Sequence, residues 1–200
     1  MHSEQSNIKH RKLLDPTTDN ALMMKVKNGD IDRLGLLFER YHHRLFAFFY
    51  RLTARRDVSE DLVQGVFERI LKYRHSFSDQ GSFSSWLFGI ARNLHIDYCK
   101  NSRPADIALD EASLEFIADD STDSTDQTDG NISHMLVRRA LEKLDPEKKQ
   151  VLILSRYEGF KYREIAAIMN CTEAAVKVRV FRALNEMKET ITAFRNQERL

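Results

Sequence analysis

Residues 157–189 constrain the fold most strongly, because they contain two short runs of helical periodicity separated by a three-residue break. The first run places four apolar residues on one helix face: Ile165, Ala166, Ile168 and Met169. After the break at residues 170–172, apolar residues recur at steps of three and four as far as Met187. Two short helices joined by a tight turn are the pattern of a DNA-binding helix-turn-helix, whose second helix enters the major groove.

The second predicted helix has a core face and an outward face. Val176 and Val180 would pack against the first helix, where the small side chain of Ala166 permits a close approach. Four residues would face outward and two bases would flank them: Ala174, Val178, Phe181 and Arg182, with Lys177 and Arg179. For this segment alone, an ordinary helical hairpin with a solvated basic face remains an alternative.

Length and composition exclude several classes of protein. Two hundred residues allow one large or two small domains. No apolar run is long enough to span a bilayer, and residues 1–18 lack the apolar centre of a signal peptide. We therefore expect a cytoplasmic protein without membrane insertion. Cys99 and Cys171 stand outside any metal-ligand or Cys-x-x-Cys spacing and are interpreted as core thiols.

Charge is distributed in blocks, although the formal net charge is only +1. Residues 1–103 carry 17 basic and 12 acidic side chains, and residues 131–200 carry 14 basic and 9 acidic ones. Between them, residues 104–130 carry 9 acidic side chains and no basic ones, in a Ser- and Thr-rich context that is typical of a disordered linker. The predicted organisation is a tail (1–18), a helical domain (19–103), a flexible acidic linker (104–131), a second helical domain (132–195) and a short tail (196–200).

Helical periodicity also dominates the first domain, so the predicted fold class is all-α, with two small helical domains and a helix-turn-helix in the second. A short helix begins at Asp19 and ends near Gly29, and a long amphipathic helix follows over residues 31–52. Because adjacent helical positions do not face each other, His42 and His43 are not expected to share a metal ion.

Two further helices complete the first domain. Asp57 and Glu60 resemble a capping box that opens a third helix, within which Gly65 costs about 1 kcal/mol relative to alanine. Residues 82–103 form an aromatic helix with interleaved basic and amide side chains, a composition that suits both single-stranded nucleic acid and core packing. In the second domain, Asp145 and Pro146 start a helix that ends at Gly159.

Three segments, in this order, resemble the extracytoplasmic-function group of the sigma-70 family of bacterial RNA polymerase sigma factors. They are SEDLVQGVFERI, GSFSSWLFGIARNLHIDYCKNSR and LDPEKKQVLILSRYEGFKYREIAAIMNCTEAAVKVRVFRAL. The resemblance covers about residues 19–103 and 132–190. It implies that the first segment docks on the β′ clamp of core RNA polymerase, that the second melts and reads the single-stranded −10 promoter element, and that the third reads the duplex −35 element.

The resemblance also implies particular site residues. Contacts with core polymerase fall on Asp61, Leu62, Gln64 and Phe67. Contacts with the −10 element fall on Arg92, Asn93, Asp97, Lys100 and Arg103, beside the loop 77–81, which would wall a pocket for one extruded base. Contacts with the −35 element fall on Thr172, Glu173, Ala174, Ala175, Lys177, Val178, Arg179, Phe181 and Arg182. An anti-sigma protein is the implied regulator.

The chain departs from the family pattern at three positions. Gly65 stands where an acidic residue is common, which removes one expected clamp contact. Lys161 stands where serine or threonine often caps the first helix of the helix-turn-helix, and the loss of such a cap costs about 1 kcal/mol. Val178 replaces a common serine on the outward face, so it offers an apolar contact to a thymine methyl in place of a hydrogen bond.

Two other functions are weighed against a promoter-specificity subunit. One is a free-standing regulator that uses the helix-turn-helix, with residues 19–103 as a sensing or dimerisation domain. The other is a small nuclease with Asp57, Glu60 and Asp61 as metal ligands, although these acids fit a helix cap better. The sequence contains no nucleophile elbow, phosphate loop or zinc pattern. We therefore expect no catalytic residue, metal or cofactor.

Overall fold

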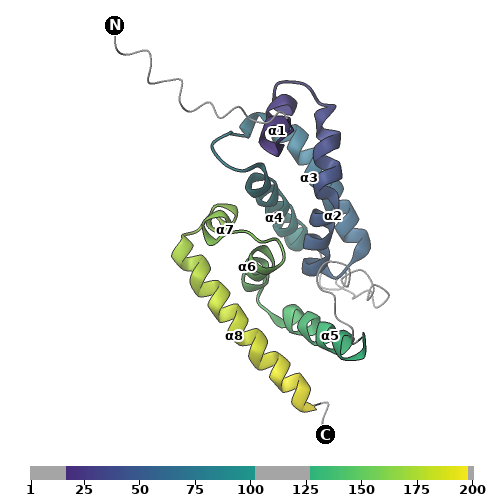
Figure 1. Cartoon of the computed structure of the whole chain (residues 1–200), viewed down its shortest axis with the longest axis vertical. Coiled ribbons are helices and arrows are strands. Elements are labelled where there is room, and N and C mark those ends of the chain that lie inside the picture. The colour runs from purple at the N-terminus through teal and green to yellow at the C-terminus, as the bar shows by residue number, and fades with distance from the viewer. Residues whose placement is uncertain (1–16, 102–126, 198–200) are drawn as a thin grey trace.

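The computed structural model describes residues 17–101 and 127–197, which form two groups of helices (Figure 1). The N-terminal domain consists of α1 (Asp19–Lys27), α2 (Arg33–Thr53), α3 (Arg56–Tyr73), the 3-10 turn η1 (Arg74–Ser76) and α4 (Phe83–Asn101). The C-terminal domain consists of α5 (Gln127–Lys143), α6 (Pro146–Arg156), α7 (Tyr162–Met169) and α8 (Glu173–Gln197). No β-strand occurs among these residues, which confirms the all-α prediction.

The domain boundaries agree with the sequence in outline only. Nearly all of the predicted tail 1–18, most of the acidic linker and Arg103 lie outside the described residues. Helix α5 begins at Gln127, inside the stretch that was predicted as linker. The first turns of α5 are polar, and apolar periodicity cannot reveal a helix start of that kind.

The core of the N-terminal domain is aromatic. Phe48 and Phe49 on α2 are completely buried, as is Phe88 on α4. The rings of Phe48 and Phe88 meet edge to face, with centroids 5.3 Å apart, which is a favourable geometry for aromatic pairs. This packing fixes α4 against α2 and so sets which face of α4 stays outside the core.

The helix ends mostly follow the sequence signals. Thr18 accepts a hydrogen bond from the Ala21 amide at the start of α1, and Asp145 accepts one from the Glu147 amide at the start of α6. Gly29 and Gly159 adopt positive φ angles of 106° and 71° just after α1 and α6. Glycine adopts such angles without a steric penalty, so both helices end where predicted.

The capping box predicted at Asp57 is wrong. Helix α3 begins two residues earlier, at Arg56, with Arg55 at the cap position and no side-chain cap. Asp57 instead pairs with Arg55, and Glu60 pairs with Arg56 at 2.9 Å. The capping box does not form because the two arginines before the predicted cap pair with its two carboxylates.

Gly65 has a packing reason for its place in α3. A Cβ atom at this position would lie 2.9 Å from Cδ2 of Leu94 on α4, closer than carbon atoms normally approach. The glycine therefore allows α3 and α4 to pack closely. The acidic residue common in the family would require Leu94 to move.

The two domains dock against each other, which the sequence did not indicate. Figure 1 shows α6 and α7 beside α4. Phe160, in the turn before α7, meets Phe88 with ring centroids 5.0 Å apart. The side chain of Glu158 is only 4% exposed and pairs with Arg44 at 3.3 Å and Arg51 at 3.6 Å, both on α2.

A lysine ammonium group extends this interface. Lys149 on α6 donates a hydrogen bond from Nζ to the backbone carbonyl of Leu52, at 2.9 Å. That carbonyl lies in the last turn of α2, where carbonyls lack helical partners and attract cations. Burial lowers the pKa of Lys149 from its usual value.

A polar chain joins α4 to α6 at the centre of the interface. Gln150 accepts a hydrogen bond from Nε of Arg92 at 3.2 Å, and its amide nitrogen lies 3.4 Å from Nδ1 of His95. His95 is buried, and its pKa is lowered to about 4 by that burial and by the nearby charge of Lys149. The docked arrangement therefore favours neutral His95.

The free energy of unfolding should decrease as the pH is lowered, because His95 is buried in its neutral form. A histidine whose folded pKa is depressed keeps its full contribution above its unfolded pKa of about 6.5 and loses it as the pH falls towards 4. The loss should approach about 3 kcal/mol near pH 4. The measurement is urea unfolding of the wild type and of His95→Gln between pH 7.5 and 4.5.

Carboxylates also titrate in this range, so the difference between the two proteins carries the information. His95→Gln should show the shallower pH dependence. His43→Gln, the same substitution at an exposed position, is the matched control variant. Parallel curves for wild type and His95→Gln would contradict the assignment.

Candidate nucleic-acid interface

Helices α7 and α8 form the predicted helix-turn-helix. Val176 and Val180 on α8 are buried, and so is Ala166 on α7, as the sequence indicated. The turn begins at Asn170, whose φ angle of 51° places it in the left-handed region that asparagine tolerates. Thr172 accepts a hydrogen bond from the Ala175 amide at 3.2 Å and so caps α8.

Glu164 partly replaces the missing cap of α7. Its carboxylate accepts a hydrogen bond from the backbone amide of Lys161 at 2.8 Å. This bond is the half of a capping box that does not need a serine or threonine at the cap position. The cost expected from Lys161 is therefore reduced.

The outward face of α8 carries most of the predicted −35 residues. Phe181 and Val178 are 66% and 47% exposed. Arg182 is also exposed, and so are the four residues Thr172, Glu173, Ala174 and Lys177. Lys177 pairs with Glu173 at 3.0 Å along the helix. This face, from Thr172 to Arg182, is called the α8 face below.

Two of the predicted −35 residues lie at the edge of that face. Arg179 is half-buried and pairs with Glu147 on α6 at 3.0 Å. Ala175 is also half-buried. Arg179 therefore helps to fix α8 on α6.

The residues predicted to read the −10 element divide between two environments on α4. Asn93 and Lys100 are exposed, and Asp97, on the same side of the helix, pairs with Arg69 of α3 at 2.8 Å. Arg92 is half-buried and bonded to Gln150 of the other domain. The structure thus brings Asn93, Asp97 and Lys100 together and turns Arg92 towards the C-terminal domain.

Asn20 holds the loop before α4 and was missed by the sequence reading. Its amide nitrogen donates to Asp79 Oδ1 at 3.1 Å and to the Gly81 carbonyl at 2.7 Å, and its oxygen accepts from the Phe83 amide at 2.8 Å. Lys27 adds a bond to the Phe77 carbonyl at 2.6 Å. No local motif links a residue in α1 to a loop some sixty positions later, so no sequence signal was available.

A recess of about 250 Å³ lies beside this loop. It is lined by the starts of α1 and α4 and by one tyrosine of α2: Thr18, Asp19, Asn20, Tyr41, Ser82, Phe83 and Ser84. Asp19 accepts hydrogen bonds from Arg40 and from the Tyr41 hydroxyl, and burial together with Asp19 raises the pKa of Tyr41. The Phe77 side chain is itself buried, so the wall of the recess comes from residues 82–84.

The predicted polymerase-binding residues fall on both sides of α3. Asp61 and Gln64 are exposed. Leu62 and Phe67 are 6% and 8% exposed and belong to the core. The family resemblance placed all four in one predicted set, and α3 buries the two apolar members against α2 and α4.

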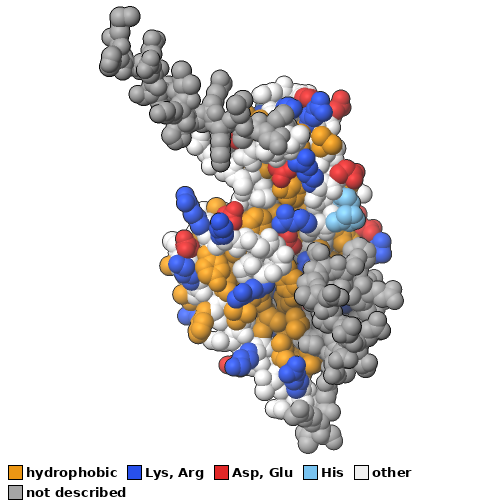
Figure 2. All heavy atoms as spheres, in the orientation of Figure 1, with side chains coloured by type: hydrophobic (Ala, Val, Ile, Leu, Met, Phe, Trp, Pro, Cys, Tyr) orange, Lys and Arg blue, Asp and Glu red, His pale blue; other side chains and the backbone are white. Residues whose placement is uncertain are grey.

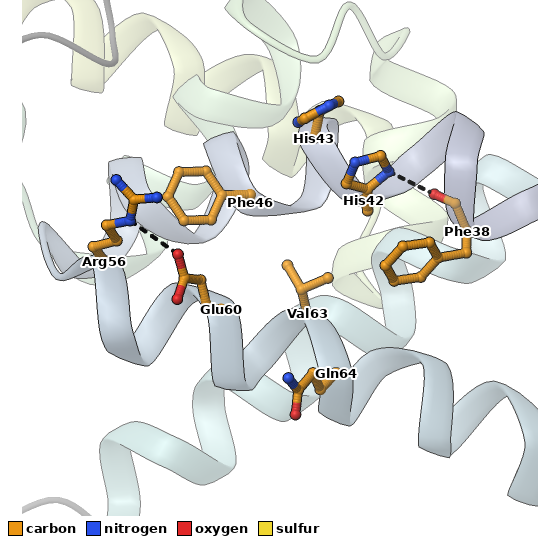
Figure 3. Close-up of a pocket in the computed structure, with 8 residues that line it drawn as sticks. All are labelled: Phe38, His42, His43, Phe46, Arg56, Glu60, Val63 and Gln64. Carbon is orange, nitrogen blue, oxygen red and sulfur yellow. Dashed lines mark hydrogen bonds and ion pairs between the residues drawn. The ribbon is translucent and has the colours of Figure 1, made fainter.

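A groove of about 340 Å³ runs between α2 and α3 next to Gln64 (Figure 3). Its lining is Phe38, His42, His43, Phe46, Arg56, Glu60, Val63 and Gln64. The His42 ring stacks on Phe38 at 4.9 Å and lies 3.8 Å from the His43 ring, so the expectation that the two histidines do not face each other is wrong. Among the described residues, no group of three or more His, Cys, Asp and Glu side chains is placed to hold a metal ion.

None of the described helices is both long enough and apolar enough to cross a membrane.

Family comparisons match both domains. Sigma-70 region 2 matches residues 37–104, and Sigma-70, region 4 matches residues 134–187. These ranges place the aromatic α4 in region 2 and the helix-turn-helix in region 4.

Curated relatives agree with these matches. The ECF RNA polymerase sigma-E factor of Escherichia coli K12 is 30% identical over 173 residues, which are 83% of this chain and 90% of the relative. The RNA polymerase sigma factor CarQ of Myxococcus xanthus is 27% identical over 169 residues, which are 84% and 95% of the two chains.

Solved structures share the fold. CnrH, in complex with the cytosolic domain of CnrY, gives a TM-score of 0.67 at 22% identity and covers 88% of this chain and 97% of its own. The sigma factor RpoE of Bartonella quintana, in complex with the anti-sigma factor NepR, gives 0.61 at 26% identity, covering 80% and 96%. The chain belongs to the extracytoplasmic-function group of the sigma-70 family, whose members are transcription initiation factors and not enzymes.

Proposed function

We propose that this protein binds core RNA polymerase through the N-terminal domain and directs it to promoters that it reads at two places. The α8 face would read the duplex −35 element, and the exposed side of α4 with its adjoining loop would capture the single-stranded −10 element. One observation carries the proposal. A single chain contains a helix-turn-helix with an exposed arginine, Arg182. It also contains α4, which buries aromatic side chains on one side and exposes Asn93 and Lys100 on another.

The physical roles differ between the two surfaces. A recognition helix discriminates sequences through base edges in the major groove, while phosphate contacts fix its position. Capture of an extruded base costs a few kcal/mol of unstacking, which a recess of suitable size and polarity offsets. The recess beside residues 82–84 is the candidate for this step.

The docked arrangement bears on DNA binding. Arg92, a proposed −10 contact, is bonded to Gln150 in the C-terminal domain. Arg92 therefore has to exchange Gln150 for DNA when the promoter binds. The resemblance to the sigma factor RpoE of Bartonella quintana, solved in complex with the anti-sigma factor NepR, supports an anti-sigma protein as the regulator of this chain too.

Reconstituted transcription tests the proposed function. The full chain is mixed with core polymerase and a genomic promoter library, and start sites are sequenced. The proposal expects starts that share two elements, only when both proteins are present. A free-standing regulator would instead retain specific DNA in the absence of polymerase, and that result would replace this proposal.

Asp61 should contribute to polymerase binding and not to folding. Asp61→Lys places a base on an exposed part of α3, so core binding should weaken at least about tenfold, equivalent to roughly 1.4 kcal/mol. The melting temperature should stay within about 2 °C, because surface substitutions rarely change stability by more than about 0.5 kcal/mol. Glu189→Lys, the same charge change on the exposed side of α8, is the control and should bind normally. An equal loss of stability in Asp61→Lys would assign Asp61 to structure.

Asn20→Ala should impair promoter melting. The substitution removes three hydrogen bonds to the loop before α4, and a loss of one or two kcal/mol corresponds to roughly five- to thirtyfold slower open-complex formation. A template with a pre-melted bubble should restore transcription. Asn28→Ala, at the exposed end of the same helix, should have no effect. If the bubble template gives no rescue, Asn20 does not act through melting.

Arg182 should contact a base edge and determine sequence preference, and Lys177 should contact a phosphate. Arginine can bond guanine O6 and N7 as a fork, so Arg182→Ala should lower activity by about ten- to a hundredfold and relax preference at one −35 position. Lys177→Ala should weaken binding to all −35 sequences alike. It should also reduce the slope of the logarithm of the binding constant against the logarithm of salt concentration by about one unit. The measurement is transcription of a saturated −35 library at two salt concentrations. If Arg182→Ala changes only the salt slope, the two roles are wrongly assigned.

A further inference from the structure

A chain of hydrogen bonds with a fixed direction crosses the interface between the two domains. It begins at Arg92 on α4, whose Nε donates to Oε1 of Gln150 on α6 at 3.2 Å. Because a guanidinium group can only donate, the oxygen of the Gln150 amide has to face Arg92. The amide nitrogen therefore faces the other way, and it lies 3.4 Å from Nδ1 of His95. In the space-filling view the side chains of the two domains are in contact (Figure 2), and Gln150 and His95 are only 4% and 6% exposed.

The direction of this chain determines which nitrogen of His95 carries hydrogen. An amide nitrogen is a donor, so Nδ1 has to accept and cannot itself be protonated. The hydrogen of the neutral ring is then on Nε2, which lies 3.6 Å from Sγ of Cys99. Burial raises the pKa of the Cys99 thiol, so its sulfur stays an uncharged, weak acceptor. The contacts of the docked state thus require a neutral His95 with hydrogen on Nε2.

The charges around His95 oppose a second proton on the ring. Burial and the positive charge of Lys149 on α6 both lower the pKa of His95. Burial also lowers the pKa of Lys149, an effect that Glu142 on α5 partly opposes, and Glu142 itself pairs with Arg138 at 3.2 Å. In the described part of the chain, no carboxylate is bonded to the His95 ring. A protonated ring would therefore be buried beside positive charge without a partner, which is unfavourable.

We propose that protonation of His95 separates the two domains and releases Arg92, so that the interface is a pH-sensitive switch acting on a DNA-contacting residue. A proton on Nδ1 turns an acceptor into a donor that faces the donor nitrogen of Gln150, and the chain breaks at that point. Gln150 then no longer holds Arg92, and the charged ring becomes hydrated in the separated state. The use of the released Arg92 on the −10 strand rests on the proposed function, whereas the separation of the domains does not.

Proton linkage gives the size and the sign of the effect. The pKa of His95 is about 4 in the docked state and returns towards about 6.5 once the ring is hydrated. The separated state therefore binds the proton more tightly, and docking weakens as the pH falls from about 6.5 towards 4. Between pH 7.5 and 5.5, the equilibrium constant for docking should fall about tenfold.

Magnetic resonance of the histidine and arginine side-chain nitrogens in the full-length protein tests the chain itself. At pH 7.5, His95 should be neutral with hydrogen on Nε2. On titration from pH 7.5 to 4, the His95 ring and the Nε–H signal of Arg92 should change with one common midpoint. His95→Asn places an oxygen acceptor where Nδ1 stood and does not titrate, so the Arg92 signal should lose this transition. The opposite tautomer, a His95 that does not titrate in this range, or an Arg92 signal that ignores His95 would each contradict the proposal.

Small-angle X-ray scattering measures the ratio of docked to separated molecules. Glu158→Gln removes the charge that Arg44 and Arg51 share, which weakens docking and makes the separated state measurable. In this variant the ratio should fall about tenfold between pH 7.5 and 5.5. Adding His95→Asn should reduce the change to less than about twofold, while adding His43→Asn at an exposed position should leave it intact. The wild type is measured beside them, and ratios that do not respond to pH in either background would overturn the proposal.

Gln150→Glu should remove or reverse the response to acid. Its carboxylate accepts both from Nε of Arg92 and from a protonated Nδ1 of His95, so protonation no longer breaks the chain. If acid separates the domains of this variant as it does those of the wild type, the proton acts elsewhere and the proposal fails.

A single-stranded oligonucleotide with the −10 element of a promoter from the transcription test separates the switch from the proposed function. The full chain should bind it more tightly at pH 5.5 than at pH 7.5, and Arg92→Ala should abolish the difference. A chain that opens in acid without gaining affinity for the strand would support the switch and defeat the role of Arg92 in DNA binding.

Discussion

The arrangement of the two domains depends on charged groups that are partly or largely shielded from solvent at their interface. Glu158 is held between Arg44 and Arg51, and the ammonium group of Lys149 sits on the carbonyl end of α2. Removing one partner of a buried pair typically costs about 3–5 kcal/mol, because the other charge stays buried without compensation. Arg44 is partly exposed, which places the cost here at the lower end. The register of the domains is therefore held by these polar contacts together with apolar packing, since one continuous cluster of buried hydrophobic residues runs through both domains and includes Phe88 and Phe160.

The polar part of this interface is suited to opening. Separating an apolar interface exposes hydrophobic surface to water at a free-energy cost. Carboxylates, guanidinium groups and ammonium groups are instead rehydrated when they separate, which offsets part of the cost. Interfaces between domains of one chain are commonly polar for this reason, and relative motion is the ordinary expectation for them. The buried neutral His95 adds a constraint in the opposite direction, since it favours the docked state only while it carries no proton. The balance between these groups sets how readily the side of α4 that carries Arg92 becomes accessible.

The sequence predicted what depends on local periodicity, and it failed where distant segments meet. Several features could be predicted because each depends on neighbours in the chain. They are the helix-turn-helix, the start of α6 at Asp145 and the helix ends marked by Gly29 and Gly159. The cap at Asp57 failed because Arg55 and Arg56 took the carboxylates.

The candidate site shows the same division. The exposed face of α8 was predicted almost completely, since one buried stripe fixes the opposite side of a helix. Leu62 and Phe67 stay predicted polymerase contacts from the resemblance, and their burial in the core could not be predicted because it depends on where α2 and α4 lie. Asn20 and Gln150 carry no signal at all in the sequence, and their roles arise only from contacts across about sixty residues.

The bond between Arg92 and Gln150 has a thermodynamic consequence for promoter choice. If DNA has to displace Gln150, every promoter is bound more weakly by one common factor, and by linkage the same factor describes how DNA loosens the docked state. Such a factor leaves the ratio between strong and weak promoters unchanged. It does keep weak promoters below saturation at concentrations where a permanently open protein would occupy both kinds. A contact that touches no base would thereby narrow the set of promoters in use.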